Sequence, residues 1–110
     1  MNSSTALDES FTALAHPARR TIVSRLARGP ATIGEATAGL GISKPAVTKH
    51  VRLLERSGVV ERTVEGRTHR LRLVPAALSD PAEWIELHRT LWESRLDAVE
   101  QHLNETKENR

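Results

Sequence analysis

Residues 32–72 read TIGEATAGLGISKPAVTKHVRLLERSGVVERTVEGRTHRLR. The pattern predicts a short helix, a glycine-containing turn, a second helix and a basic two-stranded hairpin, in that order. A short helix presented by a turn and followed by a basic hairpin is a device that reads duplex DNA. We therefore expect a helix-turn-helix over about residues 32–57, and a hairpin, called the wing here, over about residues 59–73.

Local signals predict where these helices begin and end. Thr32 and Glu35 form a capping box, in which the threonine hydroxyl accepts from the Glu35 amide and the carboxylate accepts from the Thr32 amide. Ser43 is expected to cap the second helix, with Pro45 in its first turn. Gly58 is placed to end that helix as its C′ residue.

The second helix of this pair has two different faces. On a helical wheel Val47, Val51 and Leu54 point in one direction, toward the core. The opposite face is small at its N-terminal end and cationic further along, which suits entry into a major groove N-terminus first. His50 lies at the border of the two faces and is expected to pack or to form a hydrogen bond. The residues expected to contact base edges or phosphates are Ser43, Lys44, Pro45, Thr48, Lys49, Arg52 and Arg56.

The wing separates apolar from basic side chains by strand alternation. With a turn at Glu65-Gly66, the side chains of His69, Leu71 and Leu73 share one face of the second strand. The arginines expected to lie over phosphates or the minor groove are Arg62, Arg67, Arg70 and Arg72. As a set they add affinity that does not depend on base sequence and that falls with salt.

Apolar periodicity predicts three further helices around the helix-turn-helix and the wing. They are expected over about residues 4–15, from Pro17 to the Gly29-Pro30 break, and over about residues 81–104, with Asp80 as the last cap. The predicted fold class is mainly α with a small β-hairpin. About five helices and a two-stranded antiparallel wing form a single domain over residues 1–110.

Composition limits the function classes. With 38% hydrophobic and 3% aromatic residues in 110, the monomer core must be thin, and chains of this size often complete their core by dimerising. The chain has no cysteine, which excludes disulfides, thiolate chemistry and cysteine-ligated metals. It has no long apolar run, so we expect neither a membrane span nor a secretory signal, and a cytoplasmic location follows.

Charge is unevenly distributed, although the net charge is only +2. Residues 43–72 hold eight basic and three acidic residues, a local net charge of +5. Residues 80–110 hold four basic and eight acidic residues, a local net charge of −4. This polarity favours one end that meets phosphates and another that is kept away from them, although clustering on solvated faces would give the same pattern.

The expected last helix carries too wide an apolar stripe for one neighbour to cover. We interpret it as a dimer interface built together with the first helix, the alternative being an intramolecular core. The residues assigned to this interface are Leu7, Phe11, Leu14, Trp84, Leu87, His88, Leu91, Trp92, Arg95, Leu96, Val99 and Leu103. Two reading helices would then address half-sites about one helical turn apart, or a small multiple of it, on an imperfect palindrome.

The segment from Phe11 to Leu73 resembles the ArsR family of winged helix-turn-helix repressors. It reads FTALAHPARRTIVSRLARGPATIGEATAGLGISKPAVTKHVRLLERSGVVERTVEGRTHRLRL, and its most specific part is SKPAVTKHVRLLERSGVV. The tail WIELHRTLWESRLDAVEQHL looks like the branch of that family without cysteine metal sites. The resemblance implies a bacterial or archaeal homodimer that pairs through its terminal helices, binds an operator and represses. His16 stands where the family often has an acid before Pro17.

Three polar residues interrupt the apolar stripe of the last helix. His88, Arg95 and His102 recur at i, i+7 and i+14 and are expected to hydrogen-bond with Glu93, Asp97, Glu100 or their copies in a partner chain. The alternative is a zinc or nickel site. Some relatives carry Asp-x-His followed by His-x-x-His on this helix, and Glu86, His88 and His102 would fill three of those places. The remaining place holds Val99, which cannot ligate a metal.

The predicted function is a DNA-binding transcriptional regulator whose partners are double-stranded DNA and a second copy of the chain. A metal-responsive repressor of the same fold and a protein-interaction dimer without DNA affinity are the alternatives. No cofactor is expected, and the sequence indicates no particular effector. An enzyme is not expected, because the chain has no phosphate-cradling glycine loop and no histidine spacing typical of a nucleophile and its base.

Overall fold

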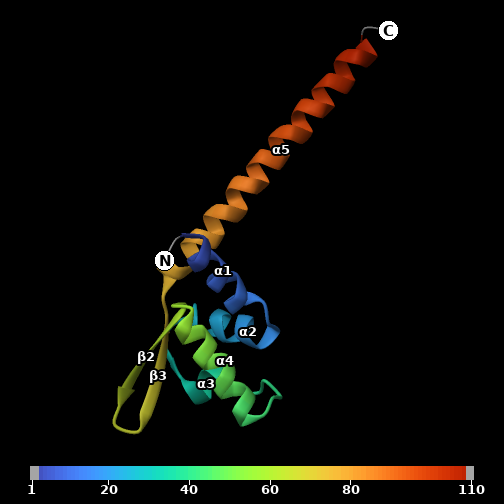
Figure 1. The fold of residues 1–110 in the computed structure, drawn as a ribbon. Coiled ribbons are helices and arrows are strands. Elements are labelled where there is room, and N and C mark those ends of the chain that lie inside the picture. Colours follow the sequence, from blue (N-terminus) through green and yellow to red (C-terminus); the bar gives the residue numbers. More distant parts are fainter. Residues whose placement is uncertain (1–2, 109–110) are drawn as a thin grey trace. The chain divides into compact units, whose positions relative to one another are not determined.

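The computed structural model describes residues 3–108, which fall into two compact units that meet at Asp80 and Pro81. The elements of the first unit are α1 (Ser3–Leu14), α2 (Pro17–Leu26), β1 (Ala31–Thr32), α3 (Ile33–Thr37), α4 (Lys44–Arg56), β2 (Val60–Glu65), β3 (Thr68–Leu73) and the 3-10 helix η1 (Pro75–Leu78). Helix α5 (Ser79–Glu108) starts at the end of this unit and forms the second one (Figure 1). The predicted fold class, mainly α with a small β-hairpin, is confirmed.

The core of the first unit lies between α2, α4 and the base of the hairpin. Its largest fully buried side chains are Ile22 of α2, Val51 and Leu54 of α4, Val59, and Leu71 of β3. These are the apolar positions that helical and strand periodicity assigned to the inside. All five are aliphatic, so close packing of small side chains replaces the aromatic core that many domains use.

Helix α1 joins the core through small residues. Ser10 and Ala13 are buried, whereas Leu7, Phe11 and Leu14 are only half-buried. The Ser10 hydroxyl lies 3.1 Å from the carbonyl oxygen of Ala6 and 3.0 Å from that of Ala77. Small side chains on the inner face let α1 lie close to its neighbours, and they leave its larger apolar residues partly uncovered.

The sheet has three antiparallel strands in the order β1-β3-β2, one more than the predicted hairpin. The added strand β1 has two residues and pairs Ala31 with Leu71. Strands β2 and β3 run side by side to a common turn (Figure 1). The turn predicted at Glu65-Gly66 is wrong by one residue, because β2 ends at Glu65 and β3 begins at Thr68. Gly66 has a φ of 61° and so occupies the first central position of a two-residue turn, where a positive φ is needed.

The predicted ends of the helix-turn-helix are confirmed. The Thr32 hydroxyl accepts from the Glu35 amide at 3.1 Å, and the Glu35 carboxylate accepts from the Thr32 amide at 3.1 Å. These bonds lower the pKa of Glu35, chiefly through the backbone bond from Thr32. Ser43 accepts from the amide of Ala46 and caps α4. At the other end Gly58 follows the C-cap of α4 with a positive φ.

Helix α5 begins at Ser79, earlier than predicted. Ser79 already has helical dihedral angles as it leaves η1, so no extended cap residue separates the two helices. The predicted cap at Asp80 is therefore wrong: Asp80 and Pro81 lie in the first turn of α5, where proline is tolerated.

Among residues 3–108, no helix combines the length and the apolarity that crossing a membrane requires.

Candidate nucleic-acid interface

The outer face of α4 is exposed, as its sequence predicted. Thr48 and Arg52 are exposed, while Val51 and Leu54 one turn away are fully buried. The other predicted DNA contacts on this helix and its cap are exposed as well: Ser43, Lys44, Pro45, Lys49 and Arg56. The Ser43 hydroxyl holds the helix N-terminus at 3.3 Å from the Ala46 nitrogen. The exposed side of α4 therefore carries Lys44, Pro45 and Thr48 near its N-terminal end and the cations Arg52 and Arg56 toward its C-terminal end.

The buried side of α4 is held by a cluster of polar residues around His50. His50 is buried, and its Nδ1 lies 3.1 Å from Nη1 of Arg19 in α2. The His16 ring lies 4.3 Å from the His50 ring, between centroids. Burial lowers the pKa of His50, and the nearby charges of His16, Arg19 and Lys49 lower it further. The expectation that His50 packs or hydrogen-bonds is confirmed.

His16 caps α2, and this explains a residue that sequence reasoning left without a role. Its Nδ1 accepts from the amide of Ala18 at 3.1 Å, and its backbone is extended, as at other N-caps. A carboxylate at this position would cap the helix in the same way. Nδ1 of His16 does so without the negative charge that a carboxylate would add.

The outer face of the wing carries two of the predicted arginines. Arg70 and Arg72 alternate with the buried Leu71 on β3 and are exposed. Arg72 lies opposite Glu61 of β2 and forms an ion pair with it. The side chain of Arg67, in the turn of the hairpin, is also exposed. These three cations share the exposed surface of one hairpin.

Arg62 is placed differently from the other three. It pairs with Leu71 across the hairpin and so shares the inner face of the sheet. Its Nη2 donates to Oε1 of Glu55 in α4 at 2.5 Å, and its Nη1 lies 3.1 Å from Nδ1 of His69 in β3. Only about a quarter of its side chain is exposed. Arg62 therefore connects the wing to α4 instead of presenting its charge on the outer face.

Comparison with known proteins agrees with this geometry. Residues 14–63 match the family model for a helix-turn-helix domain. The chain is 38% identical over 72 residues to the HTH-type transcriptional regulator Rv2034 of Mycobacterium tuberculosis, which covers 66% of this chain and 67% of that protein. It is 28% identical over 79 residues to the transcriptional repressor SdpR of Bacillus subtilis, covering 72% and 88%.

Solved structures similar to this chain identify its family. The crystal structure of an ArsR family transcriptional regulator, RHA00566, superposes with a TM-score of 0.77 at 32% identity and covers 84% of this chain and 96% of that one. The chain belongs to the ArsR family. The winged helix-turn-helix fold is shared with a homodimeric DNA-binding domain of Mb0332 from Mycobacterium bovis, with a TM-score of 0.58 at 22% identity and coverage of 86% and 84%. This ArsR-family chain is thus a transcriptional regulator with a helix-turn-helix DNA-binding domain, a role that differs from that of an enzyme.

In this ArsR-family chain α5 carries a broad exposed apolar stripe. The exposed fractions of its large apolar residues lie between 45% and 61%. The stripe consists of Trp84, Ile85, Leu87, Leu91, Trp92, Leu96, Val99 and Leu103. On soluble proteins, large exposed apolar surfaces are typical of sites that contact another molecule.

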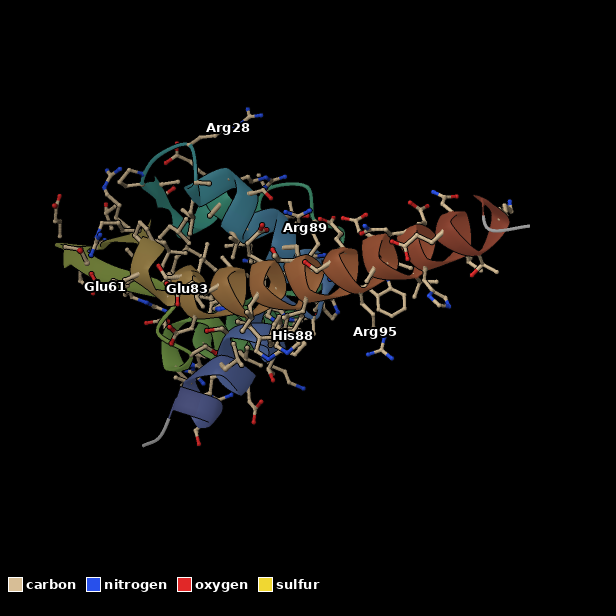
Figure 2. The ribbon with its side chains drawn as sticks, turned by 90° about the horizontal axis from the view of Figure 1, so that it is seen from above. Arg28, Glu61, Glu83, His88, Arg89 and Arg95 are labelled. Atoms are coloured by element: carbon tan, nitrogen blue, oxygen red, sulfur yellow. The ribbon has the colours of Figure 1, made fainter. Side chains whose placement is uncertain are left out.

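The polar residues on α5 are organised along the helix. His88 and Arg95 project from the same side of it, and Arg89 projects from another (Figure 2). The His88 ring stacks on Trp84 with 4.0 Å between centroids, and its Nδ1–H donates to the Trp84 carbonyl oxygen at 2.8 Å. Arg89 pairs with Glu86 at 2.5 Å and with Glu93 at 2.6 Å.

The metal candidates are not brought together within the chain. His88 and His102 are fourteen residues apart on one helix, which corresponds to about 21 Å along its axis. Glu86, the third candidate, is held by Arg89, which lowers the pKa of the Glu86 carboxylate by hydrogen bonding and charge. Over residues 3–108, no group of three or more potential ligands converges on one point.

The sequence did not reveal two arginines of α2 whose hydrogen bonds hold the helix-turn-helix together. Arg19 donates to the carbonyl oxygens of Thr12 and Ala13 at 2.8 and 3.0 Å, in addition to contacting His50. Arg25 donates to the carbonyl oxygen of Ala38 at 2.7 Å, just after α3. In the sequence, Arg19 and Arg25 are visible only as basic residues beside the apolar stripe of α2. This pattern is equally typical of a solvated helix face, so it does not predict their contacts.

Proposed function

We propose that this regulator binds an imperfect palindromic operator as a homodimer and represses transcription by occupying it. The exposed polar and cationic face of α4, flanked by a wing with an arginine-bearing outer face, is the observation that carries the proposal. Ser43, Lys44, Pro45, Thr48 and Lys49 would meet base edges or flanking phosphates, while Arg52 and Arg56 would meet the backbone. Arg67, Arg70 and Arg72 would lie on the adjacent phosphates or in the minor groove.

The homodimer would form through the terminal helices. The exposed stripe on α5 and the half-buried Leu7, Phe11 and Leu14 on α1 supply the apolar surface, with His88 and Arg95 at its polar positions. The winged helix-turn-helix domain of Mb0332, which shares this fold, is homodimeric. The two copies of α4 would address half-sites about 34–36 Å apart, or a multiple of that distance. Repression is supported by the relative SdpR, which is a transcriptional repressor.

The test combines selection of binding sites with stoichiometry. Genomic fragments bound by the purified chain are sequenced, and a recovered duplex and a scrambled duplex are then titrated by fluorescence anisotropy. Two chains per duplex, at least about 1,000-fold preference for the recovered site and an inverted-repeat sequence are expected. A monomer in sedimentation that binds both duplexes equally would overturn the proposal.

A further inference from the structure

One ion-paired cluster joins the wing to α4, and it consists of Glu55, Arg62 and His69. Nη2 of Arg62 donates to Glu55 at 2.5 Å, and Nη1 of Arg62 lies 3.1 Å from Nδ1 of His69. A guanidinium has no acceptor, so Nδ1 of His69 must accept the hydrogen bond. The cluster thus links one residue of α4 to one residue on each strand of the hairpin.

The cluster is sheltered more than the other wing pair. The side chains of Arg62 and Glu55 are 26% and 29% exposed, whereas those of Arg72 and Glu61 are 54% and 59% exposed. Nε of Arg62 is buried and has no hydrogen-bond partner within residues 3–108. Its two Nη atoms face the protein groups named above, so this guanidinium is poorly placed to grip a phosphate.

We infer that Arg62 is a positioning residue, which fixes the angle between the wing and the reading helix through Glu55 and His69. This role rests on the proposed operator binding. A duplex must be contacted by α4 and by the wing at the same time, so a fixed angle between them favours the operator over other sequences. A loose wing can still meet phosphates, because backbone contacts need no register.

The inference and a phosphate-contact role predict different results for the same substitutions. Glu55→Gln removes a negative charge, which by itself would tighten binding to any DNA. If Glu55 holds Arg62 in place, Glu55→Gln weakens operator binding by about five- to tenfold, while binding to scrambled DNA, which needs no fixed wing, tightens slightly as the charge change predicts. Glu61→Gln is the matched control. It makes the same charge change on the same hairpin but frees Arg72, so it is expected to tighten binding to both duplexes.

Arg62→Lys supplies the second test, because it keeps the charge and loses the planar fork that reaches two partners. We expect Arg62→Lys and Arg62→Gln to lose operator affinity by a similar factor of about ten, with the slope of log K against log salt unchanged. Arg70→Gln is the comparison and should lower the magnitude of that slope by about 0.9 on both duplexes. Circular dichroism and thermal unfolding confirm that each variant folds. If Arg62→Gln fails to fold, Glu55→Gln and Arg62→Lys carry the test.

Anisotropy titrations of the full chain on the recovered and scrambled duplexes, at several salt concentrations, decide the question. Tighter operator binding by Glu55→Gln, or near wild-type binding by Arg62→Lys with a reduced slope for Arg62→Gln, would overturn the inference and make Arg62 a phosphate contact. The wild-type chain tests the proposed function separately. A wild-type chain without salt-dependent affinity for either duplex overturns the proposed function itself, together with any role of Arg62 in it.

Discussion

Arg19 of α2 and His50 of α4 meet at 3.1 Å between Nη1 and Nδ1, on the buried side of the helix whose outer side carries the predicted DNA contacts. Because a guanidinium can only donate, Nδ1 of His50 must accept, and the neutral ring carries its proton on Nε2. The same guanidinium donates to two carbonyl oxygens in the last turns of α1. One side chain therefore ties three helices together and fixes how α4 is held.

Loss of the Arg19 hydrogen bonds is expected to destabilise the domain. Arg19→Met keeps much of the aliphatic stem but removes the donors to Thr12, Ala13 and His50. We expect the free energy of unfolding to fall by about 2 kcal/mol, because the buried acceptor of His50 loses its partner. Urea denaturation measures the change. Arg28→Met is the control, since the Arg28 side chain is exposed and extends outward (Figure 2), and its effect should stay within about 0.5 kcal/mol.

Acid is expected to weaken the domain through His50. The pKa of folded His50 is lowered from 6.5 by burial and by neighbouring cations, whereas the unfolded chain takes up the proton at the ordinary pKa. The unfolded state therefore binds more protons below about pH 6.5, and the stability contributed by neutral His50 is complete above that pH and declines as pH falls from it. Thermal or urea unfolding at pH 7.5, 6.5 and 5.5 measures this decline.

His50→Gln separates this group from other titrating residues, because an amide oxygen can accept from Arg19 and does not take up a proton in this range. The stability difference between pH 7.5 and 5.5 should be smaller in His50→Gln than in the wild type. Equal pH profiles for the two proteins would show that His50 does not set the acid response.

Local sequence patterns predicted most of the helices and their caps because the forces involved act within one or two turns. The Thr32–Glu35 box and the Ser43 cap join residues three positions apart, and each is present. The burial of Val51 and Leu54 follows from a helical period. The boundary predicted at Asp80 failed because η1 winds the chain into helix before the apolar stripe begins.

The contacts that hold the helix-turn-helix and the wing in place could not be predicted from local sequence patterns. Arg19 and His50 are 31 residues apart, and strand β1 owes its two residues to a neighbour about 40 positions away. Arg62 illustrates the problem most clearly. By composition it belongs with Arg70 and Arg72, and only the register of the hairpin places it on the inner face beside Glu55.

Two substitutions on α4 are expected to separate base reading from backbone contact. Thr48→Ala removes a small exposed group near the N-terminal end of α4, while Arg52→Ala removes a charge one turn further on. We expect Thr48→Ala to lower the ratio of operator to scrambled affinity by about tenfold with an unchanged salt slope. Arg52→Ala should weaken binding to both duplexes by a similar factor and lower the slope by about 0.9.

Anisotropy titrations on the two duplexes between about 50 and 200 mM salt measure both quantities. The Thr48 hydroxyl lies 3.1 Å from the Lys44 carbonyl oxygen, so Thr48→Ser, which keeps this bond, is the conservative variant. Equal loss on both duplexes for Thr48→Ala would remove Thr48 from base reading and leave it as a part of the helix surface.

The apolar stripe on α5 is expected to hold two chains together. Leu96→Glu places a charge in the stripe, where a partner helix would have to bury it, so we expect a monomer at micromolar concentration. Gln101→Glu makes the same charge change and should remain dimeric, because residue 101 is about 180° from Trp92 around the helix. Sedimentation velocity measures the state of both variants. If the stripe is the interface, Leu96→Glu should also lose operator affinity by about 100-fold or more, since each half-site then binds without its twin. A Leu96→Glu chain that stays dimeric and binds the operator normally would place the interface elsewhere and leave the exposed tryptophans of α5 for another partner.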